Sequence, residues 1–153
     1  MPTPTIVAMG GGGFLMEPEN PLLDDFVLAQ SGRERPRVCF LPTASGDSAF
    51  SIARFHAAFQ GRACEPCHLT LFGRPRTDLR DHVLSQDVVY VGGGNTANML
   101  AIWRVHCMDR ILREAWERGV VLAGVSAGMI CWFEAWVTDS FGPRGGMRDG
   151  LGF

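Results

Sequence analysis

The chain contains no lysine, and all 14 of its basic residues are arginine. A lysine amine is needed for a Ser–Lys dyad, for a Schiff base with a carbonyl substrate, and for a nucleotide-binding P-loop. The sequence therefore excludes these three mechanisms. The net charge of −2 is also unlike the strongly basic balance of nucleic-acid-binding proteins, so no nucleic-acid partner is expected.

Long apolar runs are missing as well. The longest, residues 119–133, is too short to cross a bilayer and is interrupted by a Gly-x-Ser-x-Gly turn. The first four residues, Met1-Pro2-Thr3-Pro4, have neither the basic region nor the apolar region of a signal peptide. We therefore expect a cytoplasmic protein without a membrane partner. The sequence leaves open whether it forms a homo-oligomer.

The five cysteines are an odd number and suggest no disulfide framework. Cys64-Glu65-Pro66-Cys67 has the spacing of a redox or zinc motif. A redox motif opens a helix after a strand, whereas residues 68–72, which follow it, have the pattern of a strand. A zinc site would need a second pair of ligands, and none is evident. We expect neither a metal nor a cofactor.

Buried strands are predicted at residues 5–9, 37–42, 68–72, 87–91 and 120–123, with helical segments between them. This alternation predicts a single α/β domain over residues 1–153, with a flavodoxin-like, mostly parallel sheet and helices on both faces. Residues 138–146 are rich in glycine and proline and indicate a loop or hairpin. Residues 150–153 are expected to begin another strand.

Four glycines, at positions 10–13, follow the first predicted strand. Such a loop can bind the phosphates of a dinucleotide, but the G-x-G-x-x-G spacing does not continue. Pro18 and Pro21 follow, and no helix is expected to begin at once. Close approach of the backbone to a nearby site is the favoured interpretation. A nucleotide-binding module using this loop remains an alternative.

The strongest motif is Gly124-Val125-Ser126-Ala127-Gly128, between an apolar strand and a helical segment. A strand that ends in G-x-S-x-G and turns into a helix is the pattern of a nucleophile elbow. The serine lies at a strained turn, and a Cβ at either glycine would collide with the adjoining strand or helix. Ser126 is therefore the predicted nucleophile of an acyl-transfer site.

Acyl transfer also needs oxyanion donors and a base. The peptide N–H of Ala127 is one expected donor, and that of Gly93 or Gly94 is the second. The base is harder to find because all four histidines precede Ser126. His56 and His82 are predicted on helices, His68 at the start of a strand, and His106 between helices. None of them is expected to serve.

Three segments together resemble the peptidase E family of serine peptidases. They are V-G-G-G-N-T-x-N-M-L at residues 91–100 with Trp103 after it, L-A-G-V-S-A-G at 122–128, and T-D-S-F-G at 138–142. That family includes aspartyl dipeptidases and the related cyanophycinases, and its fold is similar to that of class I glutamine amidotransferases.

The resemblance implies a serine peptidase that forms an acyl-enzyme on Ser126 and cleaves short peptides, with dipeptides carrying an N-terminal aspartate as the expected substrate. It assigns the oxyanion amides to Gly94 and Ala127, places Asn95 and Thr96 in the same pocket, and gives Asp139 a supporting catalytic role. The family's histidine and its specificity arginine would lie beyond Phe153, so the chain is expected to lack them, with its C-terminal third. A non-catalytic member that binds a small metabolite is the alternative.

Overall fold

The computed structural model describes residues 3–75 and 77–153. Its core is a five-stranded sheet in the order β1-β5-β4-β2-β3, and every neighbouring pair of strands is parallel. The predicted parallel α/β architecture is confirmed. The strands are β1 (Ile6–Met9), β2 (Arg37–Leu41), β3 (Glu65–His68), β4 (Val88–Val91) and β5 (Val121–Val125).

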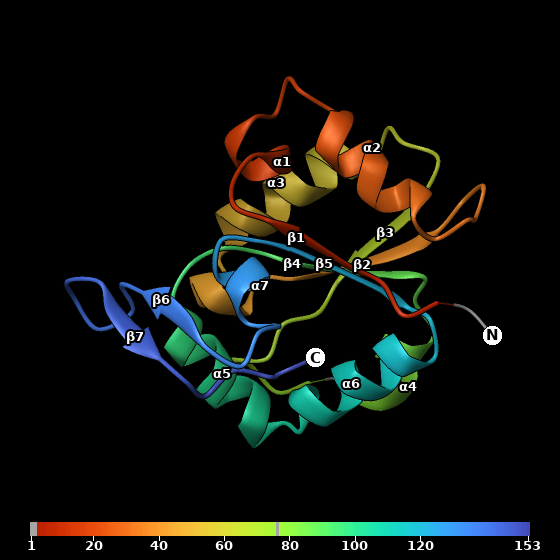
Figure 1. Cartoon of the computed structure of the whole chain (residues 1–153). Coiled ribbons are helices and arrows are strands. Elements are labelled where there is room, and N and C mark those ends of the chain that lie inside the picture. The colour runs from red at the N-terminus through yellow and green to blue at the C-terminus, as the bar shows by residue number, and fades with distance from the viewer. Residues whose placement is uncertain (1–2, 76) are drawn as a thin grey trace.

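Helices cover both faces of the sheet (Figure 1). One face carries α1 (Gly13–Met16), α2 (Leu22–Ala29) and α3 (Ala49–Phe59), and the other carries α4 (Leu79–Leu84), α5 (Thr96–Val105) and α6 (Met108–Glu117). Successive residues of a strand point to opposite faces. In β2, Val38 and Phe40 therefore pack toward α1–α3, whereas Cys39 and Leu41 pack toward α4–α6. This double burial is typical of parallel sheets.

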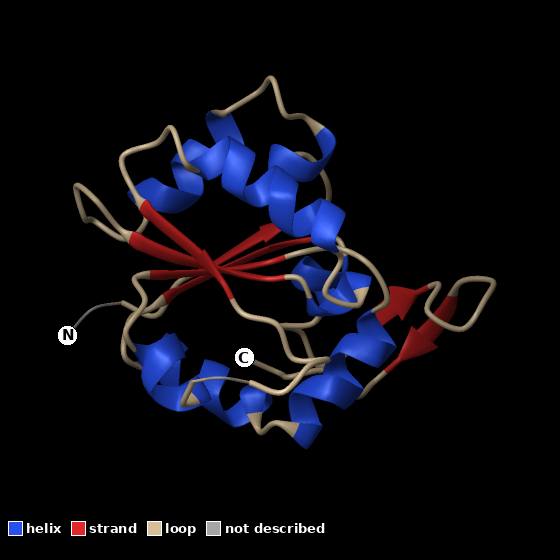
Figure 2. Ribbon diagram, turned by 180° about the vertical axis from the view of Figure 1, so that it is seen from behind, coloured by secondary structure: helices blue, strands red, loops and turns tan. Residues whose placement is uncertain are grey.

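A short helix, α7 (Ala127–Ile130), follows β5 directly. The chain then forms an antiparallel hairpin of β6 (Trp136–Thr138) and β7 (Gly145–Met147), as the glycine and proline content predicts. This hairpin extends away from the central sheet (Figure 2). Within the described residues, no helix is both long and apolar enough to cross a membrane.

The position of β3 corrects the prediction. The strand runs from Glu65 to His68 rather than over residues 68–72. Pro66 argues against a central strand because it lacks an N–H for the ladder, but edge strands tolerate proline. Among the strands of residues 3–75 and 77–153, β3 is an edge strand whose one partner is β2. As a result, His68 lies at the end of its strand and not at the start.

The glycine loop also differs from the prediction, because α1 begins within it at Gly13. The positive φ angles of Gly12 and Gly13, 84° and 68°, bring the backbone close to its neighbours. A Cβ at Gly12 would lie 2.7 Å from the Leu23 side chain, and one at Gly13 would lie 2.6 Å from the hydroxyl of Tyr90. These two glycines therefore allow α1 and α2 to pack closely on the sheet.

Residues 150–153 do not form the expected strand. Their backbone instead bonds to the segment after α7. The N–H of Leu151 donates to the carbonyl of Cys131 at 3.1 Å, and that of Phe153 donates to Trp132 at 2.9 Å. The Phe153 ring stacks on Trp116 with centroids 5.6 Å apart. Aromatic packing on α6 thus replaces pairing with a sheet.

Candidate active site

Ser126 occupies a strained turn between β5 and α7, with φ 55° and ψ −113°. Positive φ is uncommon for a residue with a side chain. The surrounding backbone holds this conformation: the Ser126 N–H donates to the carbonyl of Met9 at 3.0 Å, and its carbonyl accepts from the N–H groups of Met129 and Ile130. The residue itself is exposed. This is the nucleophile-elbow geometry that the motif predicts.

The two glycines that flank the serine are required by close backbone contacts. A Cβ at Gly124 would overlap the backbone of Gly128 at the start of α7. A Cβ at Gly128 would overlap the backbone of Val91, the last residue of β4. Glycine at positions 124 and 128 therefore allows α7 to pack against the ends of β4 and β5.

The turn after β4 brings Gly93 and Gly94 beside the elbow. A Cβ at Gly93 would lie 3.3 Å from Cβ and 3.8 Å from Oγ of Ser126. Gly94 has φ 142°, and a Cβ there would overlap the carbonyl of Ala44 in the 3₁₀ helix η1 (Thr43–Ser45). The same carbonyl accepts the N–H of Asn95 at 2.8 Å. The β4 turn is thus held between η1 and Ser126.

Asn95 is the N-cap of α5, and its side-chain amide also holds the segment that contains Asp139. Its Oδ1 accepts from the N–H of Asn98 at 2.9 Å, and its Nδ2 donates to the carbonyl of Ser140 at 2.9 Å. The Ser140 hydroxyl accepts the N–H of Ala97 at 3.3 Å. These bonds join the T-D-S-F-G segment to the N-terminus of α5.

A cavity of about 360 Å³ opens over the elbow, at the carboxyl ends of the strands. Five of the predicted site residues line it, namely Gly94, Thr96, Ser126, Ala127 and Asp139. Gly93 and Asn95 are not among its lining residues. The remaining lining residues are Gly10, Met129, Ile130, Val137, Thr138 and Arg144. Segments far apart in the chain therefore converge on Ser126.

Arg144 is the lining residue that the sequence patterns do not indicate. It lies in the loop of the β6–β7 hairpin and is exposed. Among the lining residues of this described cavity, it is the basic one and Asp139 is the acidic one. The available signal was its position two residues after the T-D-S-F-G segment. The cavity thus presents one charge of each sign near the serine.

The four histidines lie elsewhere in the described structure. Nε2 of His56 is 2.9 Å from Nδ1 of His68, so these two rings pair with each other. His82 contacts two cysteine sulfurs, and His106 ends α5. Burial, and then the charge of His56, lower the pKa of His68. None of the described residues lining the Ser126 cavity is a histidine.

Solved structures share this architecture. One, of a peptidase from an acI-B1 actinobacterium, superposes with a TM-score of 0.71 at 19% identity, covering 96% of this chain and 63% of that one. Another, of a protein from Listeria monocytogenes EGD-e described as a candidate peptidase E, gives a TM-score of 0.59 at 21% identity, covering 70% of this chain and 55% of that one. At these identities the likeness establishes the fold.

The sequence comparisons go further. An uncharacterized peptidase of Bacillus subtilis strain 168, YgaJ, is 60% identical over 148 residues, which cover 97% of this chain and 64% of that protein. The chain thus spans somewhat less than two thirds of this relative's length. The family described as Peptidase family S51 matches residues 6–152, nearly the whole chain. This chain belongs to peptidase family S51.

Proposed function

We propose that this chain carries the nucleophile and the oxyanion site of a serine peptidase. The observation that supports this most directly is Ser126 itself, exposed in a strained elbow at the floor of a cavity. Enzymes hold residues in such sparsely populated backbone conformations where chemistry requires it. The N–H of Ala127 and that of Gly93 or Gly94 are the proposed oxyanion donors.

The reaction would pass through an acyl-enzyme. The Ser126 hydroxyl oxygen bonds to the carbonyl carbon of the scissile peptide while a general base takes the hydroxyl proton. The C–N bond then breaks, and the base returns that proton to the leaving amine. Water, deprotonated by the same base, adds to the ester and releases the carboxylic acid and the free serine.

The proposed substrate is a short peptide with an N-terminal aspartate. A cavity of about 360 Å³ is at the small end of ligand sites, which suits a dipeptide better than a long chain. Arg144 supports the acidic residue, because a guanidinium can bind a carboxylate through two parallel hydrogen bonds. It is a different residue from the specificity arginine that the family resemblance would place after Phe153. Asp139, which lines the same cavity, is the proposed supporting catalytic carboxylate.

We also propose that the general base is not one of the four histidines of this chain. Their positions support this. His56 and His68 pair with each other. His82 contacts the sulfurs of Cys39 and Cys67. A protein as long as YgaJ would have further residues that could supply the base.

A fluorophosphonate probe and an Asp-X dipeptide test the proposal on residues 1–153 and on any longer gene product. The probe should label Ser126 of the longer protein, and Ser126→Ala should abolish labelling and hydrolysis. Ser51→Ala on α3, which does not line the cavity, is the matched control. A longer protein that is never labelled, yet binds metabolites, would support the non-catalytic alternative. Equal turnover by both lengths would show that a histidine of this chain is the base.

A further inference from the structure

Outside the Ser126 cavity, three side chains of types that bind zinc converge on the sheet face that α4, α5 and α6 cover. Cys39 of β2 and Cys67 of β3 are register partners on neighbouring strands, so their side chains lie side by side on one face. His82 comes from α4, which covers that face. The candidate ligand atoms of the three residues all lie within 4.8 Å of one another.

Their geometry is close to that of a tetrahedral zinc site. Nε2 of His82 is 3.7 Å from the sulfur of Cys39 and 3.7 Å from the sulfur of Cys67. A Zn²⁺ ion with Zn–S of ~2.3 Å and Zn–N of ~2.0 Å separates a sulfur and a nitrogen by ~3.5 Å at a tetrahedral angle. One nitrogen therefore already faces both sulfurs at the spacing that coordination needs.

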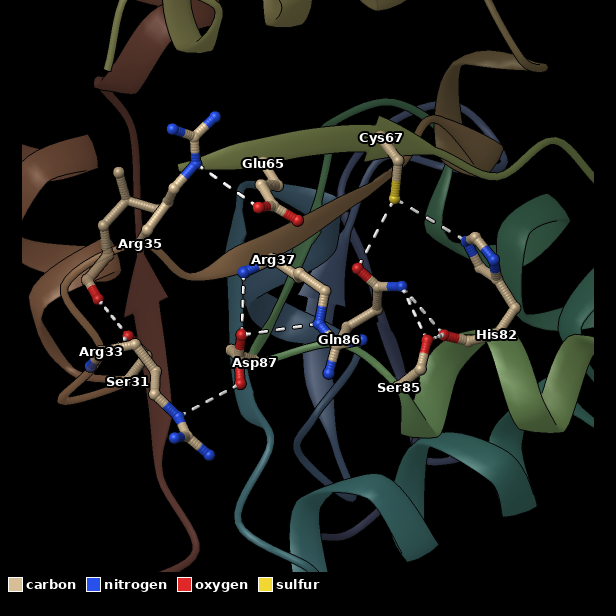
Figure 3. Close-up of polar contacts among 11 residues, drawn as sticks. Ser31, Arg33, Arg35, Arg37, Glu65, Cys67, His82, Ser85, Gln86 and Asp87 are labelled. Carbon is tan, nitrogen blue, oxygen red and sulfur yellow. Dashed lines mark hydrogen bonds and ion pairs between the residues drawn. The ribbon is translucent and has the colours of Figure 1, made fainter. Parts of the chain in front are cut away.

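Gln86 offers an oxygen on the Cys67 side of the cluster (Figure 3). Its Nε2 donates to the carbonyl of His82 at 3.0 Å and to the hydroxyl of Ser85 at 3.2 Å. A carbonyl accepts only, so the amide nitrogen must face it, and this orients Oε1 toward Cys67. Oε1 lies 3.6 Å from that sulfur. A fourth ligand, or an acceptor for a metal-bound water, is thus in place.

An entry path is also present. Cys39 is fully buried, but Cys67 and His82 are half-buried. A separate cavity of about 270 Å³ is lined by His82 and His68. None of the three cluster residues lines the Ser126 cavity. A metal ion could thus reach the sulfurs without passing through the peptidase site.

We propose that Cys39, Cys67 and His82 form a structural Zn²⁺ site that joins the edge strand β3 and the helix α4 to β2. Binding replaces two S–H bonds with two Zn–S bonds and releases two protons. The sequence-based expectation that there is no zinc site rested on the spacing of Cys64 and Cys67. Cys64 faces the opposite side of the sheet, where its sulfur lies 3.4 Å from the carbonyl of Phe59.

The test is metal content and affinity in the reduced full chain. After incubation with Zn²⁺ and dialysis, the wild type should retain one equivalent, measured by mass spectrometry of the metal. Cys67→Ser and His82→Gln should weaken binding by at least about 10²-fold, since even outer-shell losses cost 10–100-fold. Cys64→Ser and His106→Gln are matched controls that should bind normally.

Cobalt keeps the proposal testable if a variant fails to fold. The folded wild type with Co²⁺ should show a thiolate-to-metal absorption band and the visible spectrum of a tetrahedral site. Absence of that band, or zinc retention no greater in the wild type than in His82→Gln, would overturn the proposal. A metal-free protein whose intact mass lacks two hydrogens under reducing conditions would also overturn it, if peptide mapping places the disulfide between Cys39 and Cys67.

Discussion

Gly93 lies directly against Ser126: a methyl group at position 93 would lie 3.3 Å from Cβ and 3.8 Å from Oγ of Ser126. The nearest backbone atom to such a group is the carbonyl oxygen of Val125 at 3.6 Å, so the main chain leaves room for it. The neighbouring Gly94 is different, because a methyl group there would overlap the main chain of Ala44. A side chain is therefore opposed by Ser126 at position 93 and by the main chain of Ala44 at position 94.

The first prediction concerns Gly93→Ala. The fold should survive, and the added methyl should displace the serine hydroxyl and lower kcat/KM by on the order of 10²-fold, the cost of small misplacements at a reacting centre. Steady-state kinetics on a form of the protein that hydrolyses the dipeptide, together with circular dichroism, measure the two effects. Gly94→Ala should instead lose stability. An active Gly93→Ala enzyme would remove Gly93 from the site.

The second prediction separates strain from catalysis at Ser126. Ser126→Ala keeps a side chain at φ 55°, whereas Ser126→Gly relieves a conformation that costs about 1–3 kcal/mol. Both variants should lose activity by roughly 10⁴-fold or more. The glycine variant should be more stable than the alanine variant by about 1 kcal/mol after its greater unfolded-state entropy is subtracted. Urea denaturation measures this, and equal stabilities would argue against strain.

The third prediction tests the role of Arg144. Arg144→Gln should raise KM for an Asp-X dipeptide by roughly 10–10²-fold, the usual worth of a charged hydrogen bond, with less effect on a substrate whose N-terminal residue is neutral. Arg148→Gln, in the same region but outside the cavity lining, is the control. If both variants cleave both substrates like the wild type, Arg144 has no role in recognising an N-terminal aspartate.

The fourth prediction is a pH effect on stability. Asp24 is buried, accepts a hydrogen bond from the Tyr90 hydroxyl at 3.1 Å, and lies 3.6 Å from Arg62. Burial raises its pKa despite these partners. An acid with a raised folded-state pKa contributes stability below its unfolded pKa, and this contribution is lost as pH rises through the folded value.

The free energy of unfolding should therefore carry a falling component as pH rises from about 4, the pKa of an unfolded aspartate. Asp24→Asn cannot ionise and should lack this component, although it can still accept from Tyr90. Urea titrations across the acidic range compare the two proteins. Asp25→Asn, whose carboxyl is exposed, is the control. Identical slopes for wild type and Asp24→Asn would contradict the assignment.

Features that depend on local chemistry could be predicted from the sequence. The alternation of apolar runs with helical patterns indicated a parallel sheet covered on both faces, because buried strands and amphipathic helices have distinct periods. The N-cap of α5 is equally local, because Asn95 accepts from the N–H of Asn98 three residues later. The G-x-S-x-G motif indicated the elbow, since Gly124 and Gly128 lie within a few residues of the strained serine.

Only the tertiary structure decided which distant segments meet. Gly94 is constrained by Ala44, and Arg144 reaches the Ser126 cavity through a hairpin; both contacts join segments that are far apart in the chain. The three-residue shift of β3, from 68 to 65 at its start, follows from its place at the sheet edge, where Pro66 is tolerated. That shift aligns Cys67 with Cys39, and α4 then adds His82. Strand order and register set these neighbours, and a linear pattern of residues does not encode either one locally.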